Sequence, residues 1–176
     1  MKSLNQYINE KLKVSKKQYN YCPKTREELD DLLALLLEER GWEADLNDID
    51  TSNITDMSKL FYKTEDFNGD VSGWDVSNVT NMQYMFAYCT KFEGKCLENL
   101  DVSNVTNMNS IFYDCENLNC NLSNWDVSNV TNMESMFAGC KKLNCDLSNW
   151  DVSNVTNKWW MFYECPIKDV YKPKFK

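Results

Sequence analysis

The chain has 176 residues, of which 43% are hydrophobic, and a formal net charge of −8. This length suits one domain or one array of repeats, and the negative charge argues against general binding to nucleic-acid phosphates, which needs clustered lysine and arginine. The chain contains no histidine, which excludes Ser-His-Asp and Cys-His catalysis and histidine-ligated zinc.

Residues 1–45 are predicted to form a polar arm followed by a helix that caps the repeats after it. Thr25 and Glu28 have the spacing of a capping box, in which each side chain caps a backbone N–H group of the other. Gly41 suits the position just past a helix, so we expect the helix to span about residues 25–40. Its apolar face consists of leucines spaced three and four residues apart: Leu29, Leu32, Leu33, Leu36 and Leu37.

The same region predicts the compartment. No apolar segment typical of a secretory signal follows Met1, and the longest apolar run, residues 32–37, is far shorter than the ~20 residues that span a bilayer. We therefore expect a cytoplasmic protein that does not contact a membrane. In that reducing compartment the eight cysteines are expected to be thiols.

The phrase Asp-Val-Ser-Asn-Val-Thr-Asn recurs every 25 or 26 residues and dominates the rest of the chain. It begins at Asp75, Asp101, Asp126 and Asp151, and a diverged copy begins at Asp50. A period in this range is typical of a solenoid, in which each repeat is one coil and the stacked coils build the core. We predict a solenoid of five coils over residues 46–165 and a C-terminal tail over residues 166–176.

The apolar spacing within the coils favours a leucine-rich repeat. Leu97-x-x-Leu100-x-Val102 has the strand signature of that fold. Each Trp-Asp-Val segment is then predicted to be a short strand of a concave parallel sheet, with the Thr-Asn-Met segment forming a helical turn on the convex side. The predicted fold class is an α/β repeat, a leucine-rich-repeat-like solenoid of five coils with short parallel strands and an N-terminal helical cap.

One motif makes a family resemblance specific. Val-Ser-Asn-Val-Thr-Asn-Met-x-x-Met-Phe-x-x-Cys, closed by Leu-Ser-x-Trp, resembles the repeat of BspA-like bacterial surface proteins, a branch of the leucine-rich repeats, over about residues 46–165. The resemblance implies adhesion or protein recognition. The opening Met-Lys-Ser-Leu-x-x-Tyr-Ile resembles the start of many phage-encoded proteins, which implies a phage or mobile-element origin.

A column of aspartates supplies the first candidate partner-binding residues. On stacked strands these carboxylates would lie ~4.8 Å apart on the concave face and repel by about 0.9 kcal/mol per neighbouring pair. The interpretation we favour is that hydrogen bonds within an Asx-turn offset this repulsion, and the alternative is a cationic partner or bound Ca²⁺. The residues are Asp50, Asp75, Asp101, Asp126 and Asp151.

Trp159 and Trp160 are the other candidate partner-binding residues. They stand in the final repeat at columns that hold mostly polar residues elsewhere, next to Lys158 in place of the usual core methionine. In one interpretation the two tryptophans pack under the C-terminal tail as a cap. In the other they are an exposed hot spot, because tryptophan is enriched at such sites.

The cysteines form two columns, and no metal site is predicted from them. Those three residues after each phenylalanine suit a small buried apolar position. Two adjacent Cys-x₄-Cys pairs make a four-cysteine zinc site the alternative, which we do not favour because the first column already has a core role. The columns are Cys89, Cys115, Cys140 and Cys165, and then Cys96, Cys120 and Cys145.

The function these features predict is non-catalytic binding of a protein partner with a basic surface, through the acidic concave face, by a monomer without a cofactor. One alternative is an inhibitor of a nucleic-acid-handling host defence enzyme that occupies the enzyme's basic groove. The other is a carbohydrate-active enzyme, which needs two carboxylates in unlike environments. A ladder of equivalent aspartates does not offer such a pair, so we predict no enzyme activity and no direct contact with nucleic acid.

Overall fold

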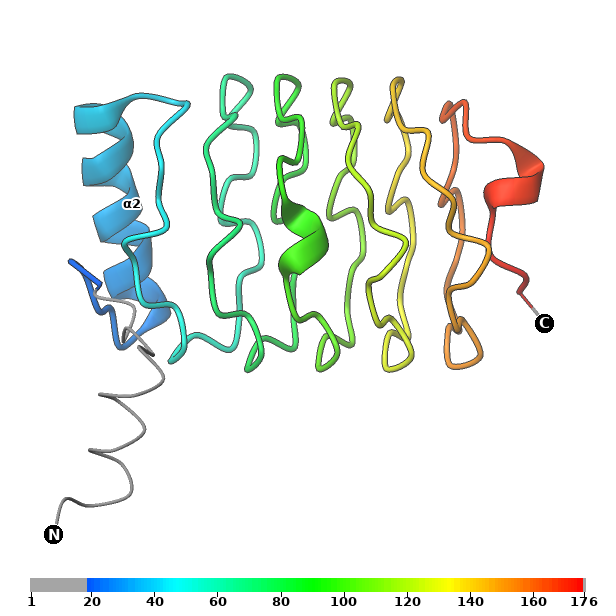
Figure 1. Ribbon diagram of the computed structural model, residues 1–176, viewed down its shortest axis with the longest axis horizontal. Coiled ribbons are helices and arrows are strands. Elements are labelled where there is room, and N and C mark those ends of the chain that lie inside the picture. The colour runs from blue at the N-terminus through cyan, green and yellow to red at the C-terminus, as the bar shows by residue number, and fades with distance from the viewer. Residues whose placement is uncertain (1–18, 176) are drawn as a thin grey trace, which may run out of the picture.

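The computed structural model describes residues 19–175. Its helices are the α-helix α2 (Arg26–Arg40) and the short 3₁₀ helices η1 (Leu97–Asn99) and η2 (Asp169–Tyr171). The repeats lie side by side in one row, with α2 at one end and η2 at the other (Figure 1). We number them repeat 1 to repeat 5, which comprise residues 50–74, 75–100, 101–125, 126–150 and 151–175.

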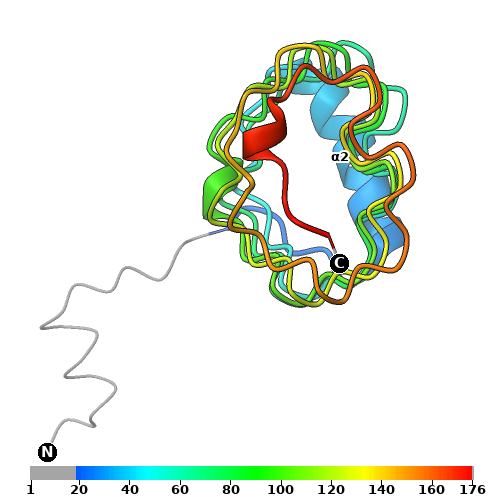
Figure 2. The same cartoon turned by 90° about the vertical axis from the view of Figure 1, so that its right-hand side faces the viewer.

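The predicted fold class is wrong, because residues 19–175 contain no strand and no sheet. Isolated parallel bridges join neighbouring repeats instead, for example between Asn81 and Asn107 and between Asn107 and Asn132. A leucine-rich-repeat solenoid of the α/β class needs short strands and helical turns in its coils, and neither forms as predicted. The row is straight in Figure 1, and the repeats superimpose when viewed end on in Figure 2, so the concave sheet is absent too.

Turns within each repeat explain why strands do not form. In repeat 2 the Asp75 carboxylate accepts a hydrogen bond from the Ser77 N–H at 3.1 Å, and the Asn81 amide oxygen accepts one from the Gln83 N–H at 3.2 Å. Tyr84 follows with a φ of 57°, in the left-handed region. These turns bend the chain after every few residues, so no straight segment is long enough for a strand.

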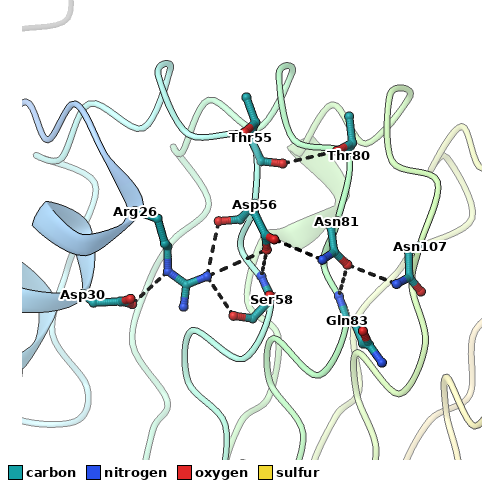
Figure 3. Close-up of polar contacts among 9 residues, drawn as sticks. All are labelled: Arg26, Asp30, Thr55, Asp56, Ser58, Thr80, Asn81, Gln83 and Asn107. Atoms are coloured by element: carbon teal, nitrogen blue, oxygen red, sulfur yellow. Dashed lines mark hydrogen bonds and ion pairs between the residues drawn. The ribbon is translucent and has the colours of Figure 1, made fainter.

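Backbone hydrogen bonds nevertheless connect each repeat to the next in register. The N–H groups of Met82 and Phe86 donate to the carbonyls of Asn107 and Ile111 at 3.0 and 2.9 Å. Asparagine side chains add a second set of bonds, and Asn107 Nδ2 donates to Asn81 Oδ1 at 3.2 Å (Figure 3). The recurring polar residues therefore hold the repeats together as well as turning the chain.

The core of the row is a continuous stack of phenylalanine rings. Neighbouring rings lie nearly parallel, with centroids 5.5–5.8 Å apart. Buried tryptophans pack beside the stack, and the Trp125 indole N–H donates to the Leu97 carbonyl at 2.8 Å. Each apolar column of the sequence thus forms one line through the core. The stacked rings are Phe61, Phe86, Phe112, Phe137 and Phe162.

The helix predicted over residues 25–40 is confirmed as α2. The Thr25 hydroxyl accepts a hydrogen bond from the Glu28 N–H at 3.2 Å, and the Gly41 N–H donates to the Leu37 carbonyl at 3.0 Å. Its buried face consists of Leu29, Leu33 and Leu36, which cover the apolar interior of the row at this end. In the described part of the chain, no helix has the length and apolar character to cross a membrane.

Arg26 on α2 caps the backbone of repeat 1 (Figure 3). Its Nη1 donates to the carbonyls of Ser58 at 2.8 Å and Asp56 at 3.3 Å, while its Nε pairs with Asp30 at 2.9 Å. In the later repeats the equivalent carbonyls accept hydrogen bonds from backbone N–H groups of the preceding repeat. The Arg26 guanidinium therefore supplies hydrogen bonds that the N–H groups of a preceding repeat would otherwise donate.

Candidate functional site

The five predicted aspartates occupy equivalent turns, one in each repeat. Each carboxylate accepts a hydrogen bond from the serine N–H two residues later, at 3.0–3.2 Å. The Ser128 hydroxyl and N–H lower the pKa of Asp126, and the Ser52 hydroxyl lowers the pKa of Asp50. The Asx-turn interpretation is thus confirmed. The carboxylates are Asp50, which is half-buried, and the exposed Asp75, Asp101, Asp126 and Asp151.

Trp159 and Trp160 lie at the C-terminal end, and 71% and 66% of their surface is exposed. They are therefore not packed under the tail, and the cap interpretation is wrong for them. Lys158 is exposed as well, and its ammonium group lies 4.5 Å from the centroid of the Phe175 ring. The two tryptophans thus form one exposed pair at the C-terminal end. The aspartates lie in turns of their own, one in each repeat.

A surface that the sequence analysis did not identify crosses repeats 1 to 5. We call it the aromatic face, and its rings are exposed or half-buried. Tyr62 lies 5.8 Å from Tyr84 and 5.7 Å from Tyr88, and Tyr88 lies 5.2 Å from Tyr113, all between ring centroids. Its members are Tyr62, Tyr84, Tyr88, Tyr113, Trp160 and Tyr163.

The same two turns recur in every repeat and place three rings of this face, those of Tyr84, Tyr88 and Trp160. Two residues per repeat, four apart, have a positive φ between 52° and 75°. In this conformation a side chain stands at the corner of the repeat, and non-glycine residues are held there only by surrounding contacts. The residues are Lys59, Tyr84, Ser110, Ser135 and Trp160 at the first turn, and Lys63, Tyr88, Asp114, Gly139 and Glu164 at the second.

Small residues between the large rings open two adjoining hollows in the face. The first has a volume of about 340 Å³, and Ser135 and Ala138 form its floor between the rings of Tyr113, Trp160 and Tyr163. The second, of about 450 Å³, adds polar groups, among them those of Asn109 and Glu134. Aromatic linings with a few polar groups are typical of pockets that bind ligands.

Gly139 follows the hollow-lining Ala138 and lies directly against Asp114. Its φ is +75°, and a Cβ at this position would collide with the Asp114 carboxylate. Repeat 2 has Tyr88 at the equivalent turn, where a full side chain fits because no carboxylate lies beneath it. The pair of Asp114 and Gly139 thus places a carboxylate where another repeat has an aromatic ring.

Charge is divided unevenly along the face. At its N-terminal side the Lys63 ammonium lies 5.2 Å from the Tyr62 centroid and 5.7 Å from the Tyr88 centroid. At its C-terminal side carboxylates accompany the rings, and the charge of Asp114, then burial, then the charge of Glu164 raise the pKa of Tyr113. Burial and the charge of Glu116 also raise the pKa of Asp114. Lys141 already pairs with Glu116 at 2.6 Å and offsets part of this effect on Asp114. The C-terminal side still carries more carboxylates than cations among these residues.

The first cysteine column is structural. The thiols of Cys89, Cys115 and Cys140 are buried, and each donates to a phenylalanine carbonyl of the preceding repeat at 3.0–3.1 Å. Burial raises the pKa of Cys89 to about 12 and raises those of Cys115 and Cys140 well above their usual value. Between residues 19 and 175, no three metal-ligating side chains lie together.

Two segments of the chain, residues 30–97 and 91–169, match the family described as Mycoplasma protein of unknown function, DUF285. The chain belongs to this family. The matched segments include the aspartate that opens each repeated phrase and both Trp159 and Trp160. These candidate residues therefore lie inside the region that matches the family. The comparison with curated proteins finds no significant match, and neither does the comparison with solved structures.

Proposed function

We propose that this protein is a non-catalytic recognition module that binds a basic segment of a partner protein on its aromatic face. The observation that supports the proposal is the placing of the Asp114 carboxylate beside exposed rings that the backbone holds in position. Tyrosine, tryptophan and arginine dominate the binding energy of protein interfaces, and rigid rings lose little conformational entropy on binding. The face therefore has the composition of an interface.

The protein contains its own example of the interaction we propose. Lys63 lies against two tyrosine rings at the N-terminal side of the face. At the C-terminal side a lysine or arginine of the partner would enter the 340 Å³ hollow between Tyr113 and Trp160. There its charge would be attracted by the Asp114 carboxylate, which adjoins Tyr113 outside the lining of the hollow. A cation over an aromatic ring contributes about 0.5–2 kcal/mol, depending on how far it is desolvated.

The aspartate column has a supporting role in this proposal. Its exposed carboxylates contribute to the net charge of −8. Such a charge attracts a basic partner over distances of about a Debye length, roughly 8 Å at physiological salt, and so accelerates association more than it tightens the complex. We therefore move the centre of the binding site from the aspartates to the aromatic face.

The finer resemblances of the sequence fit this proposal. The likeness to BspA-like surface repeats implies protein recognition, which agrees with binding through the aromatic face. Inhibition of a nucleic-acid-handling enzyme is the special case in which the basic partner surface is a nucleic-acid groove. The phage or mobile-element origin and the cytoplasmic location are further proposals.

The direct test titrates the full chain with an eight-residue peptide of alternating arginine and glycine, followed by tryptophan fluorescence. We expect saturable binding that the double variant Tyr113→Ser, Trp160→Ser weakens by tenfold or more. The matched control is Trp42→Ser, because Trp42 is also exposed, at 45%, but lies outside the face. Equal binding by the wild type and the double variant would disprove the aromatic-face site.

A second variant tests the earlier site. In Asp75→Asn, Asp126→Asn two exposed carboxylates of the aspartate column lose their charge while each turn keeps an oxygen acceptor. We expect a slower association rate, a weaker dependence on salt and an almost unchanged dissociation rate. A large rise in the dissociation rate would return the centre of the site to the aspartates.

A further inference from the structure

We use the term wall for residues 56–63 of repeat 1 and their equivalents in the other repeats. In repeats 1 to 4, alternate backbone N–H groups of the wall donate to carbonyls of the following repeat. In repeat 4, alternate N–H groups from Met133 to Gly139 donate to carbonyls of repeat 5 at 2.8–2.9 Å. The accepting carbonyls belong to Asn157, Trp159, Met161 and Tyr163.

The last wall has no such neighbour. Its equivalent N–H groups are those of Lys158, Trp160, Phe162 and Glu164, and none of them has a hydrogen-bond partner within residues 19–175. We call this row the open edge. An unpaired row of backbone donors at every second residue is a template for the addition of another extended segment.

The C-terminal tail covers a different part of the last repeat. The Tyr171 carbonyl in η2 accepts a hydrogen bond from the Leu147 N–H at 2.8 Å, so the tail pairs with a part of repeat 4 that lies outside the wall. Figure 2 shows η2 on the side of the row opposite α2, whereas Arg26 of α2 contacts the wall of residues 56–63. The end of the tail then crosses toward the open edge, where the Lys172 ammonium lies 5.6 Å from the Phe162 ring centroid and the Phe175 ring lies 4.5 Å from the Lys158 ammonium. These side chains flank the open edge, but its backbone N–H groups stay unpaired within residues 19–175.

A second copy of the chain does not fit the open edge. The carbonyls that could accept from it are those of repeat 1, and Arg26 already donates to Asp56 and Ser58 there. The helix α2 also covers the core at that end. Two open edges placed against each other would oppose donors with donors. We therefore consider a segment of another protein as the occupant.

The surroundings of the open edge define the chemistry of that segment. An apolar hollow of about 640 Å³ lies beside it, between Phe162, Trp159 and Phe175. Phe162 is the last ring of the phenylalanine stack, and it is only half-buried. Lys158 stands in the column that holds a buried methionine in the other repeats, namely Met57, Met82, Met108 and Met133. A segment that packs here therefore needs an apolar residue on Phe162 and an acidic residue opposite Lys158.

We propose that the open edge binds an acidic-apolar segment of a partner protein, which takes up the turns of a wall and adds to the row as one further wall. Its alternate carbonyls accept from Lys158, Trp160, Phe162 and Glu164, and its acidic side chain pairs with the Lys158 ammonium. The acid belongs at that end because Glu164 lies at the other. The ligand of the open edge is acidic, whereas the ligand proposed for the aromatic face is basic. Trp160 takes part in both sites, with its ring in the aromatic face and its backbone N–H in the open edge.

The test uses two synthetic peptides with the sequence of residues 129–139, whose equivalent carbonyls pair with repeat 3 in the intact chain. One peptide keeps the natural sequence and the other carries Met133→Glu, which places an acid opposite Lys158. We expect the glutamate peptide to bind the full chain at least tenfold more tightly. In the protein variant Lys158→Met the preference should reverse, because a methionine pair then matches the other repeats.

Amide hydrogen exchange read by NMR gives the second measurement. In the unbound chain we expect the amides of Trp160, Phe162 and Glu164 to exchange much faster than their equivalents Ser135, Phe137 and Gly139. The glutamate peptide should slow exchange at those three amides. Slow exchange without peptide, failure of both peptides to bind, protection at other amides, or concentration-dependent dimers in light scattering would each disprove the proposal. The Trp160→Ala variant keeps its N–H, so it should lose arginine-peptide binding and retain the glutamate peptide.

Discussion

The two ends of the row differ in how they cover the apolar core where the stacking of repeats stops. At the N-terminal end α2 buries the core, Arg26 caps two carbonyls, and Phe61 is 1% exposed. At the C-terminal end a tail with one 3₁₀ helix covers part of the repeat, and Trp159 and Trp160 remain exposed. Repeat proteins need a polar cap where stacking stops. The incomplete cap at the C-terminal end is the physical basis of the proposed open-edge site.

The largest expected effect compares the two terminal rings of the phenylalanine stack. Phe61→Ala removes a ring that stacks on Phe67 at 3.9 Å and on Phe86 at 5.5 Å, and a buried phenylalanine cut to alanine costs about 3–5 kcal/mol. Phe162→Ala removes a half-buried ring that stacks on Phe137 alone in the part of the chain described, so we expect roughly half that loss. Urea unfolding followed by circular dichroism measures both.

Equal losses would mean that the C-terminal ring is as well covered as the N-terminal one. In that case the open edge would be closed in solution, and the difference between the two ends would not exist. A loss for Phe162→Ala that is restored by the glutamate peptide would sharpen the comparison, because binding adds stability only to the folded state.

The next effect removes the cap itself. Arg26→Ala leaves the carbonyls of Asp56 and Ser58 without the charged donor, and we expect the free energy of unfolding to fall by about 1–2 kcal/mol. The matched variant Arg26→Lys keeps the charge but loses the planar fork that reaches both carbonyls and Asp30. It should recover less than half of the loss. Full recovery by lysine would show that charge alone stabilises this end.

The repeat period and the capping helix could be predicted from the sequence because both depend on local patterns. Thr25 and Gly41 mark the ends of α2, and the aspartate turns follow from the Asp-x-Ser spacing. The strands could not be excluded in the same way. Leu97-x-x-Leu100-x-Val102 matches a strand signature, but Asp and Asn side chains compete for the same backbone N–H groups and turn the chain first.

The aromatic face was missed for a different reason. Aligning the repeats draws attention to positions that stay constant, and those positions form the core and the turns. Tyr62, Tyr113 and Tyr163 stand at one position that alternates between tyrosine and alanine, and the position of Tyr88 holds a different residue in every repeat. The tyrosine that recurs in every second repeat was the signal that could have been noticed. The residues of the proposed recognition surface thus stand at positions where the repeats differ.

The smallest effect concerns one ion pair at each end and its dependence on pH. Arg40 binds Asp48 with both guanidinium nitrogens at 3.0 Å and lowers the pKa of that carboxyl. A lowered pKa in the folded state stabilises the protein above the unfolded pKa of about 4, and this contribution disappears as the pH falls through the folded value. Asp48→Asn should therefore cost up to about 1 kcal/mol at pH 7 and nothing near pH 2.

At the other end Lys172 pairs with Asp169 at 2.8 Å and lowers its pKa in the same direction. The Asp169 side chain is 94% exposed, however, so water and salt screen the pair and Asp169→Asn should leave stability unchanged at both pH values. Urea unfolding of the two variants at pH 7 and pH 2.5 measures the contrast. If Asp169→Asn were the more damaging change at pH 7, the C-terminal tail would be a true cap, and the open edge beside it would lose its physical basis.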